Sequence, residues 1–213
     1  YTDYSNLRVI GLDSNGGYQV QAQLDWLEAV LSDACFDDNI DFVFAQLHHP
    51  FKSELWTPGE TNYTGDVIEL MENFSDECDK PSIHFFGHTH GYSRGQSKDH
   101  DHLWVNVATA GGAIDNWGDY PQADYDEFTV TQDEWGFVVV DVEAGDEPQF
   151  ALKRISRGGD DEDDGFMDNE MRDEIIVRMN NTMPNQPVGL SHTGQQDPDL
   201  LVLSADDFLD ADG

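Results

Sequence analysis

The chain has 213 residues, of which 38% are hydrophobic and 11% aromatic, so it is long enough to bury a core and is not disordered as a whole. Its 44 Asp and Glu residues against 10 Lys and Arg residues give a formal net charge of −34, which argues against nucleic-acid and anionic-membrane partners by repulsion. A surface adapted to high salt explains this charge, and a secreted protein that is merely acidic is the alternative. No apolar run approaches ~18 residues, so the sequence predicts no membrane span.

The first half of the chain alternates between strand and helix patterns. Short apolar runs predict buried strands at residues 7–12, 41–47 and 83–86. Apolar residues at spacings of three and four predict helices over residues 21–34 and 66–75. Asp66 is expected to cap the second helix, since Asp is a favoured N-cap residue.

The second half changes character. Residues 103–109, 134–142 and 149–155 read as strands with no helix between them, which predicts an antiparallel continuation. Together the two halves predict an α/β class, in the form of a mixed sheet or a β-sandwich covered by helices.

Three segments are expected along the chain. Residues 1–157 form the main domain, residues 158–183 are too acidic to pack and read as a loop or linker, and residues 184–213 read as the start of a following domain or a tail. The chain opens without Met and closes in mid-motif, so we expect it to be part of a larger chain.

An acidic run at residues 160–165 loosely matches a calcium-binding loop. Met171 stands where such a loop requires a bidentate Glu, and acidic runs are mostly solvated. Calcium at this run is therefore the minor alternative. Cys35 and Cys78 each follow a predicted helix and precede a predicted strand, so a disulfide and two buried free thiols both stay open.

Two histidine clusters carry the chemistry. His48 and His49 follow the second predicted strand, and His88 and His90 follow the third, where open α/β sheets place their ligand sites. Side chains alternate in an extended segment, so His88 and His90 are expected to point the same way. Imidazoles converging from two strand ends predict a transition-metal site. His84 is expected to pack within its strand, and His100 and His102 to lie in a polar connection near the site.

The motifs around these residues make a specific resemblance. The segment F-A-Q-L-H-H-P at 44–50 resembles the V-x-x-H block of the calcineurin-like metallophosphoesterases, and G-H-T-H-G-Y-S-R at 87–94 resembles their G-H-x-H block. The continuation to a Tyr and an Arg is similar to the purple acid phosphatase branch. The resemblance covers residues 1–157 and implies a sandwich of two β-sheets with helices on both outer sides.

The resemblance also implies roles for single residues. His48 and His88 would bind one metal ion and His90 the other, the pair being divalent or trivalent Fe, Zn or Mn. His49 would give a proton to the leaving group or contact a phosphate oxygen, or else support the loop. Tyr92 and Arg94 would reach the phosphate, with Arg94 counted among the catalytic residues, or would lock the loop.

The sequence departs from the family in lacking three upstream blocks, D-x-H or D-x-G, G-D and G-N-H, which supply the bridging carboxylate, further ligands and an Asn. Gly65-Asp66 matches a G-D only literally. We therefore expect the N-terminal part of the site to be missing from these residues, and little or no catalysis by them alone.

Three functions remain from the sequence. The first is a secreted or cell-surface metal-dependent hydrolase acting on phosphomonoesters or phosphodiesters. The second is a non-catalytic, acidic cell-surface or calcium-binding module on a degenerate phosphoesterase scaffold. The third, a mononuclear structural zinc site at His48, His88 and His90, is disfavoured because such sites usually use Cys and four protein ligands.

Overall fold

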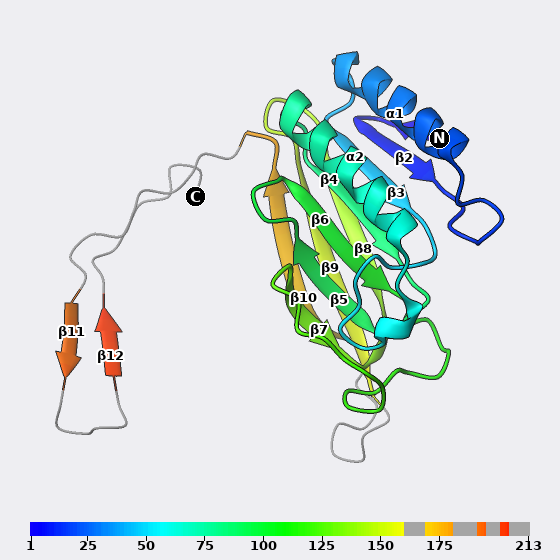
Figure 1. Cartoon of the computed structure of the whole chain (residues 1–213). Helices are drawn as coiled ribbons and strands as arrows, with labels where there is room; N and C mark the ends of the chain where they lie inside the picture. The colour runs from blue at the N-terminus through cyan, green and yellow to red at the C-terminus, as the bar shows by residue number, and fades with distance from the viewer. Residues whose placement is uncertain (160–168, 181–190, 195–200, 205–213) are drawn as a thin grey trace. The chain divides into compact units, whose positions relative to one another are not determined.

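The computed structural model describes residues 1–159, 169–180, 191–194 and 201–204. The chain divides into two compact units, Tyr1–Met179 and Asn180–Gly213. The smaller unit contains an antiparallel pair, β11 (Ser191–Gly194) and β12 (Leu201–Ser204). The larger unit carries both α-helices and the two larger sheets (Figure 1).

The larger unit begins with β1 (Thr2–Tyr4), β2 (Leu7–Gly11), α1 (Gln21–Phe36), β3 (Phe42–Gln46), the 3-10 helix η1 (Thr57–Gly59), α2 (Asn62–Cys78) and β4 (Ser82–Phe86). It continues with β5 (Tyr92–Gln96), β6 (His102–Val107), β7 (Phe128–Gln132), β8 (Trp135–Glu143), β9 (Gln149–Gly158) and β10 (Glu170–Arg178). The predicted order of strands and helices in the first half is confirmed.

A mixed seven-stranded sheet forms the centre of this unit. Its strand order is β1-β2-β3-β4-β6-β5-β7, with β2, β3, β4 and β6 parallel to one another. The strands β1, β5 and β7 pair antiparallel at the two sides. Because β3 and β4 are parallel neighbours, the loops that follow them meet at one edge of the sheet.

A second, antiparallel sheet of order β10-β9-β8 packs on one face of the first. The aromatic rings of Phe42 and Phe44 on β3 meet Phe150 on β9 edge-on, with centroids 5.1 and 5.2 Å apart. Tyr92 of β5 and Leu152 of β9 are fully buried in the same cluster. The predicted sandwich of two sheets is therefore confirmed.

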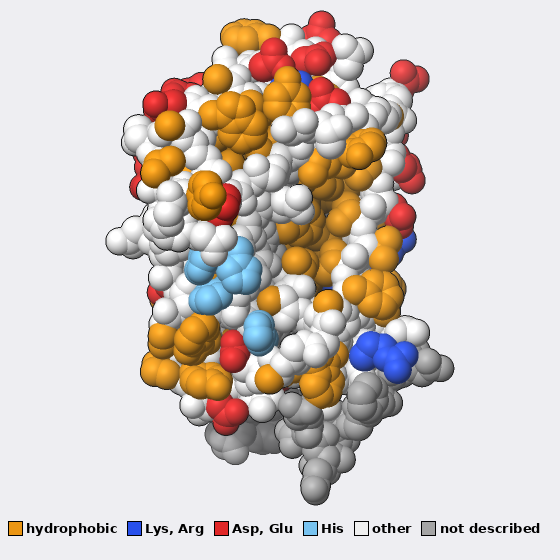
Figure 2. Space-filling model, turned by 90° about the vertical axis from the view of Figure 1, so that its right-hand side faces the viewer, with side chains coloured by type: hydrophobic (Ala, Val, Ile, Leu, Met, Phe, Trp, Pro, Cys, Tyr) orange, Lys and Arg blue, Asp and Glu red, His pale blue; other side chains and the backbone are white. Residues whose placement is uncertain are grey.

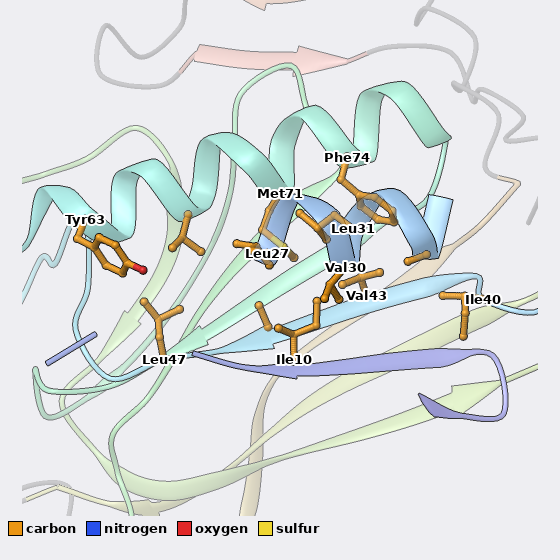
Figure 3. Packing of buried hydrophobic residues seen from close by; sticks show 13 residues of the cluster. Ile10, Leu27, Val30, Leu31, Ile40, Val43, Leu47, Tyr63, Met71 and Phe74 are labelled. Carbon is orange, nitrogen blue, oxygen red and sulfur yellow. The ribbon is translucent and has the colours of Figure 1, made fainter. Parts of the chain in front are cut away.

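The helices α1 and α2 cover the other face of the seven-stranded sheet. Figure 3 shows Leu27, Val30 and Leu31 of α1 and Met71 of α2 converging on the strands below them. The buried side chains occur at helical spacing because one stripe of each helix faces the sheet. In the described ranges both helices lie on this sheet, so the expectation of helices on both outer sides is not met there.

A disulfide joins Cys35 of α1 to Cys78 of α2, with their Cα atoms 5.4 Å apart. The disulfide is therefore the alternative that the structure adopts. Neither described helix is long and apolar enough to cross a membrane.

Helix α2 begins earlier than its apolar pattern predicts. Its N-cap is Thr61, so the expected cap at Asp66 was wrong. Gly65 lies inside the helix, where an added Cβ would stand 2.9 Å from the ring of Phe51. The glycine therefore allows close packing and does not mark the helix start.

The expected acidic linker over 158–183 also contains an element that its composition hid. Glu170–Arg178 form β10, which pairs with β9. Asp173, Ile175 and Val177 alternate toward the space between the sheets, whereas Glu174 and Ile176 face outward. The possible calcium loop at 160–165 lies outside the described residues.

Candidate metal centre

The site stands at the carboxyl ends of β3 and β4. Backbone bonds hold the two loops together, because Leu47 N–H donates to the Phe85 carbonyl at 3.0 Å and Gly87 N–H donates to the His48 carbonyl at 3.0 Å. His48 and His49 directly follow β3, and His88 follows β4. The rings of these three residues therefore lie side by side. Figure 2 shows a group of histidine side chains on this face of the molecule.

Three imidazole rings form a compact cluster. One ring nitrogen each of His48, His49 and His88 lies within 4.8 Å of the others. His48 Nε2 and His88 Nδ1 are 3.0 Å apart. Two nitrogens that bind one tetrahedral zinc at ~2.0–2.1 Å stand roughly 3.3 Å apart. The rings of His48 and His88 therefore need to move apart by only a few tenths of an ångström to hold one metal ion.

The backbone of His88 is unusual in a way that serves this arrangement. Its φ of 68° lies in the left-handed region, which costs a non-glycine residue on the order of 1–3 kcal/mol. Gly59 of η1 packs directly on the ring, since an added Cβ would lie 3.0 Å from it. The centroid of the Trp56 ring lies 5.3 Å from that of the His88 ring. Such strain, held in place by packing, is typical of functional sites.

The electrostatics favour the neutral form of two of these rings. Burial lowers the pKa of His88, and the neighbouring imidazoles lower it further against the opposing effect of Asp115. Burial and then His48 likewise lower the pKa of His49, while the Ser14 backbone and Asp13 act in the other direction. A neutral imidazole is the form that binds a metal ion, so these shifts favour a metal site.

His90 lies in the same hollow but not in the cluster of three. The hollow is lined by His48, His88 and His90 among others, and none of the described residues that line it is Lys or Arg. His90 Nδ1 is 2.6 Å from the Ala113 carbonyl, so it donates there and leaves Nε2 as the free ring nitrogen. The Asp115 carboxylate accepts a bond from the backbone N–H of His90 at 2.7 Å. A carbonyl that fixes the ring in this way is the usual support of a metal-binding histidine.

The structure does not bring Tyr92 and Arg94 to the histidines. Both side chains point into the space between the two sheets, where Asp173 of β10 accepts bonds from the Tyr92 hydroxyl at 2.7 Å and from two Arg94 nitrogens at 2.6 and 2.9 Å. Burial acts to raise the pKa of Asp173, but the bonds from Arg94 and Tyr92 outweigh it and hold the pKa below its usual range. The geometry favours the locking role for this pair over phosphate binding.

Two further expectations concern histidines at the other end of the strands. His84 is fully buried and packs within its strand, as predicted. His102 was expected in a polar connection near the site, and this was wrong. It begins β6 and is fully buried, with Nε2 at 2.9 Å from His84 Nδ1 and Nδ1 at 2.7 Å from Ser82 Oγ. His100 is partly exposed and bonds to Asp76.

Sequence reasoning missed two residues that shape the site. Ser14 is fully buried, and its hydroxyl contacts His48 and His49. Asp115 accepts a hydrogen bond from the backbone of His90. Ser14 follows the predicted strand at residues 7–12 and Asp115 lies in a loop, so neither position carries a local signal of function.

The sequence matches no protein-family model and no curated protein sequence. Two solved structures with the calcineurin-like metallophosphoesterase fold are similar to it. The first is GAP50, the anchor in the inner membrane complex of Plasmodium, with 18% identity and a TM-score of 0.53 over 70% of this chain and 45% of that chain. The second is PhoD, with 10% identity and a TM-score of 0.50 over 75% of this chain and 33% of that chain. The likeness shows the fold alone, and the chain spans less than half the length of either protein.

Proposed function

We propose that this chain supplies the histidine ligands of a binuclear transition-metal centre that hydrolyses phosphoesters. The observation that carries the proposal is the 3.0 Å separation of His48 Nε2 and His88 Nδ1, with His90 in the same hollow. These residues follow parallel strands of a sheet in a metallophosphoesterase-like fold, where ligands are expected.

The donor set fits a transition metal. His48 and His88 would hold one ion, and His90 would hold the second through its free Nε2. Neutral imidazole suits Zn, Fe and Mn, and it is a poor ligand for Ca, which takes oxygen. When bound, two such cations supply Lewis acidity toward the phosphoryl oxygens and a water-derived nucleophile near neutral pH.

The residues of this chain prepare the site in three ways. The strained backbone of His88 aims its ring at His48, and the Ala113 carbonyl holds the ring of His90 in one orientation. Since the described residues that line the hollow include no Lys or Arg, phosphate affinity would rest on the metal ions. We assign Tyr92 and Arg94 to holding the sheets together, through Asp173.

The missing oxygen ligands belong to the same proposal. Because the chain spans 45% and 33% of the two similar structures, we propose that sequence outside these residues provides the bridging carboxylate. The Cys35–Cys78 disulfide supports a secreted or cell-surface location, since disulfides persist in oxidising compartments.

One observation favours a second candidate, a non-catalytic module. The similar Plasmodium structure is described as an anchor, so this fold also serves where the described role is attachment. An acidic cell-surface module that keeps the histidines would bind metal without turnover.

Hydrolysis measurements separate the two functions. We would assay p-nitrophenyl phosphate and bis-p-nitrophenyl phosphate with this chain and with the longest natural polypeptide that contains it, each with its metal content measured. Hydrolysis by the longer form, with about two metal ions and loss of activity in His90→Ala, is the expected result. Metal binding without hydrolysis in the longer form would favour the non-catalytic module.

A further inference from the structure

Ser14 joins the loop after β2 to the end of β3 through one hydroxyl. Its side chain is fully buried. Its Oγ lies 3.0 Å from the backbone nitrogen of His48, 2.9 Å from the backbone nitrogen of His49 and 3.0 Å from His49 Nδ1. All three contacts are within hydrogen-bond distance.

The number of partners decides the direction of each bond. A serine hydroxyl has one hydrogen to donate and two lone pairs to accept with. The two backbone N–H groups can only donate, so they occupy both lone pairs. The hydroxyl hydrogen must then go to His49 Nδ1, which accepts it. A neutral imidazole carries one proton, and with Nδ1 as the acceptor that proton stands on Nε2.

The other tautomer, with the proton on His49 Nδ1, leaves hydrogen-bonding groups without partners. A proton on His49 Nδ1 would bring a third donor to an oxygen with two lone pairs, and would leave the Ser14 hydroxyl hydrogen without an acceptor among the described residues. The Ser14 carbonyl acts to raise the pKa of this ring, but among the described residues its hydrogen bond comes from the Gln19 amide at 2.8 Å and none comes from a His49 ring nitrogen.

We infer that Ser14 is a positioning residue that fixes the proton of His49 on Nε2, so that His49 faces the site as a hydrogen-bond donor and is not a third metal ligand. Its ring centroid is 4.5 Å from that of His88 and 4.8 Å from that of His48, so the donor stands beside the metal-binding nitrogens. A ring nitrogen that carries a proton has no lone pair for a metal ion.

The role of this donor rests on the proposed function. Beside a bound phosphoester, the Nε2–H group would donate a hydrogen bond to a phosphoryl or leaving-group oxygen. Complete transfer of this proton would turn a neutral ring into an imidazolate anion, so we assign hydrogen bonding and not proton transfer. Of the three roles that the sequence left open for His49, this selects contact with a phosphoester oxygen.

The position of the ring proton can be read directly. Long-range ¹H–¹⁵N NMR spectra of histidine-labelled chain, recorded without metal at about pH 8, above the ordinary His pKa of ~6.5, distinguish the two tautomers. His49→Gln assigns the signals of that ring. We expect the proton on His49 Nε2. A proton on Nδ1 in the unmodified chain would overturn the inference, whether or not the chain hydrolyses anything.

Variants test the part that Ser14 has in this choice. Ser14→Ala should give a mixture of His49 tautomers, and Ser14→Thr, which keeps the hydroxyl, should restore the single form. Ser97→Ala is the matched control, because Ser97 is another buried serine, whose hydroxyl accepts a bond from Trp104 Nε1. An unchanged His49 spectrum in folded Ser14→Ala would refute the positioning role. If Ser14→Ala does not fold, the NMR spectrum of the unmodified chain still tests whether the proton of His49 stands on Nε2.

Metal affinity tests whether His49 is a ligand. With Co²⁺ as the probe, His48→Gln should weaken binding by at least ~10-fold, whereas His49→Gln should change it by less than ~3-fold. Equal losses in both variants would show that His49 is a ligand and overturn the inference. Failure of both the chain and its longer natural form to bind Co²⁺ would defeat the proposed function, and the ring-proton measurement would still judge the inference about Ser14.

Discussion

One carboxylate, that of Asp173, links the two sheets by hydrogen bonds, and its removal gives the clearest stability prediction. Asp173 accepts three hydrogen bonds, two from Arg94 and one from Tyr92. The side chains of Arg94 and Asp173 are only 13% and 9% exposed. Asp173→Ala would leave a nearly buried guanidinium and a buried hydroxyl without this partner.

The expected loss follows from that burial. Breaking a buried ion pair by removing one partner costs about 3–5 kcal/mol, and the remaining exposure places this pair near 3 kcal/mol. For a chain of this size, about 3 kcal/mol corresponds to a fall in Tm of roughly 6–12 °C. Urea unfolding followed by tryptophan fluorescence measures the change in the free energy of unfolding.

A surface pair supplies the control. Lys153 and Asp141 form an ion pair 2.9 Å long, with side-chain exposures of 34% and 58%. Asp141→Ala should cost at most ~1 kcal/mol, because exposed pairs contribute little. If Asp173→Ala also cost less than ~1 kcal/mol, the assignment of Arg94 and Tyr92 to sheet packing would be refuted.

Three further predictions concern stability. Burial lowers the pKa of His84 to about 3 from an unfolded value of ~6.5, and it also lowers the pKa of His102. The free energy of unfolding should therefore be greatest above pH 6.5 and should fall as the pH drops from there toward 3. Urea unfolding between pH 8 and pH 5 measures this dependence on pH, and His84→Leu should reduce it. The 43-residue separation of Cys35 and Cys78 predicts that reduction of the disulfide costs about 4 kcal/mol, and an unchanged urea midpoint in reductant would contradict this. The net charge of −34 predicts a higher Tm in 1 M than in 0.1 M salt, since the Debye length falls from ~10 to ~3 Å, and a Tm that did not rise would argue against a repulsive surface.

The sequence predicts well those elements whose own residues decide their form. The strand β3 is a short continuous apolar run, and α1 has its buried residues at spacings of three and four, so their existence and approximate bounds followed from the pattern. The strands β5 and β10 were missed because Ser, Arg, Gly, Asp and Glu interrupt their apolar residues, and β7 was missed although Phe and Val alternate with Thr in it. Their form depends on partners distant in the chain, such as the pairing of Arg94 with Asp173, 79 residues later.

In the candidate site, too, some residues could be predicted from the sequence and others could not. The histidines could be found because each cluster directly follows a buried strand, and parallel pairing then brings two of them together. The contact of Ser14 with the first histidine pair spans 34 and 35 residues and has no local pattern. The turn of Tyr92 toward the second sheet likewise depends on where β10 packs, which the acidic composition of that region concealed.

The most direct test of the metal centre is anomalous diffraction from crystals grown with Zn²⁺. The account predicts an anomalous peak ~2.0–2.1 Å from both His48 Nε2 and His88 Nδ1, because the two nitrogens already stand 3.0 Å apart. Crystals that show no peak between these rings at saturating Zn²⁺, or only peaks at surface carboxylates, would contradict the account.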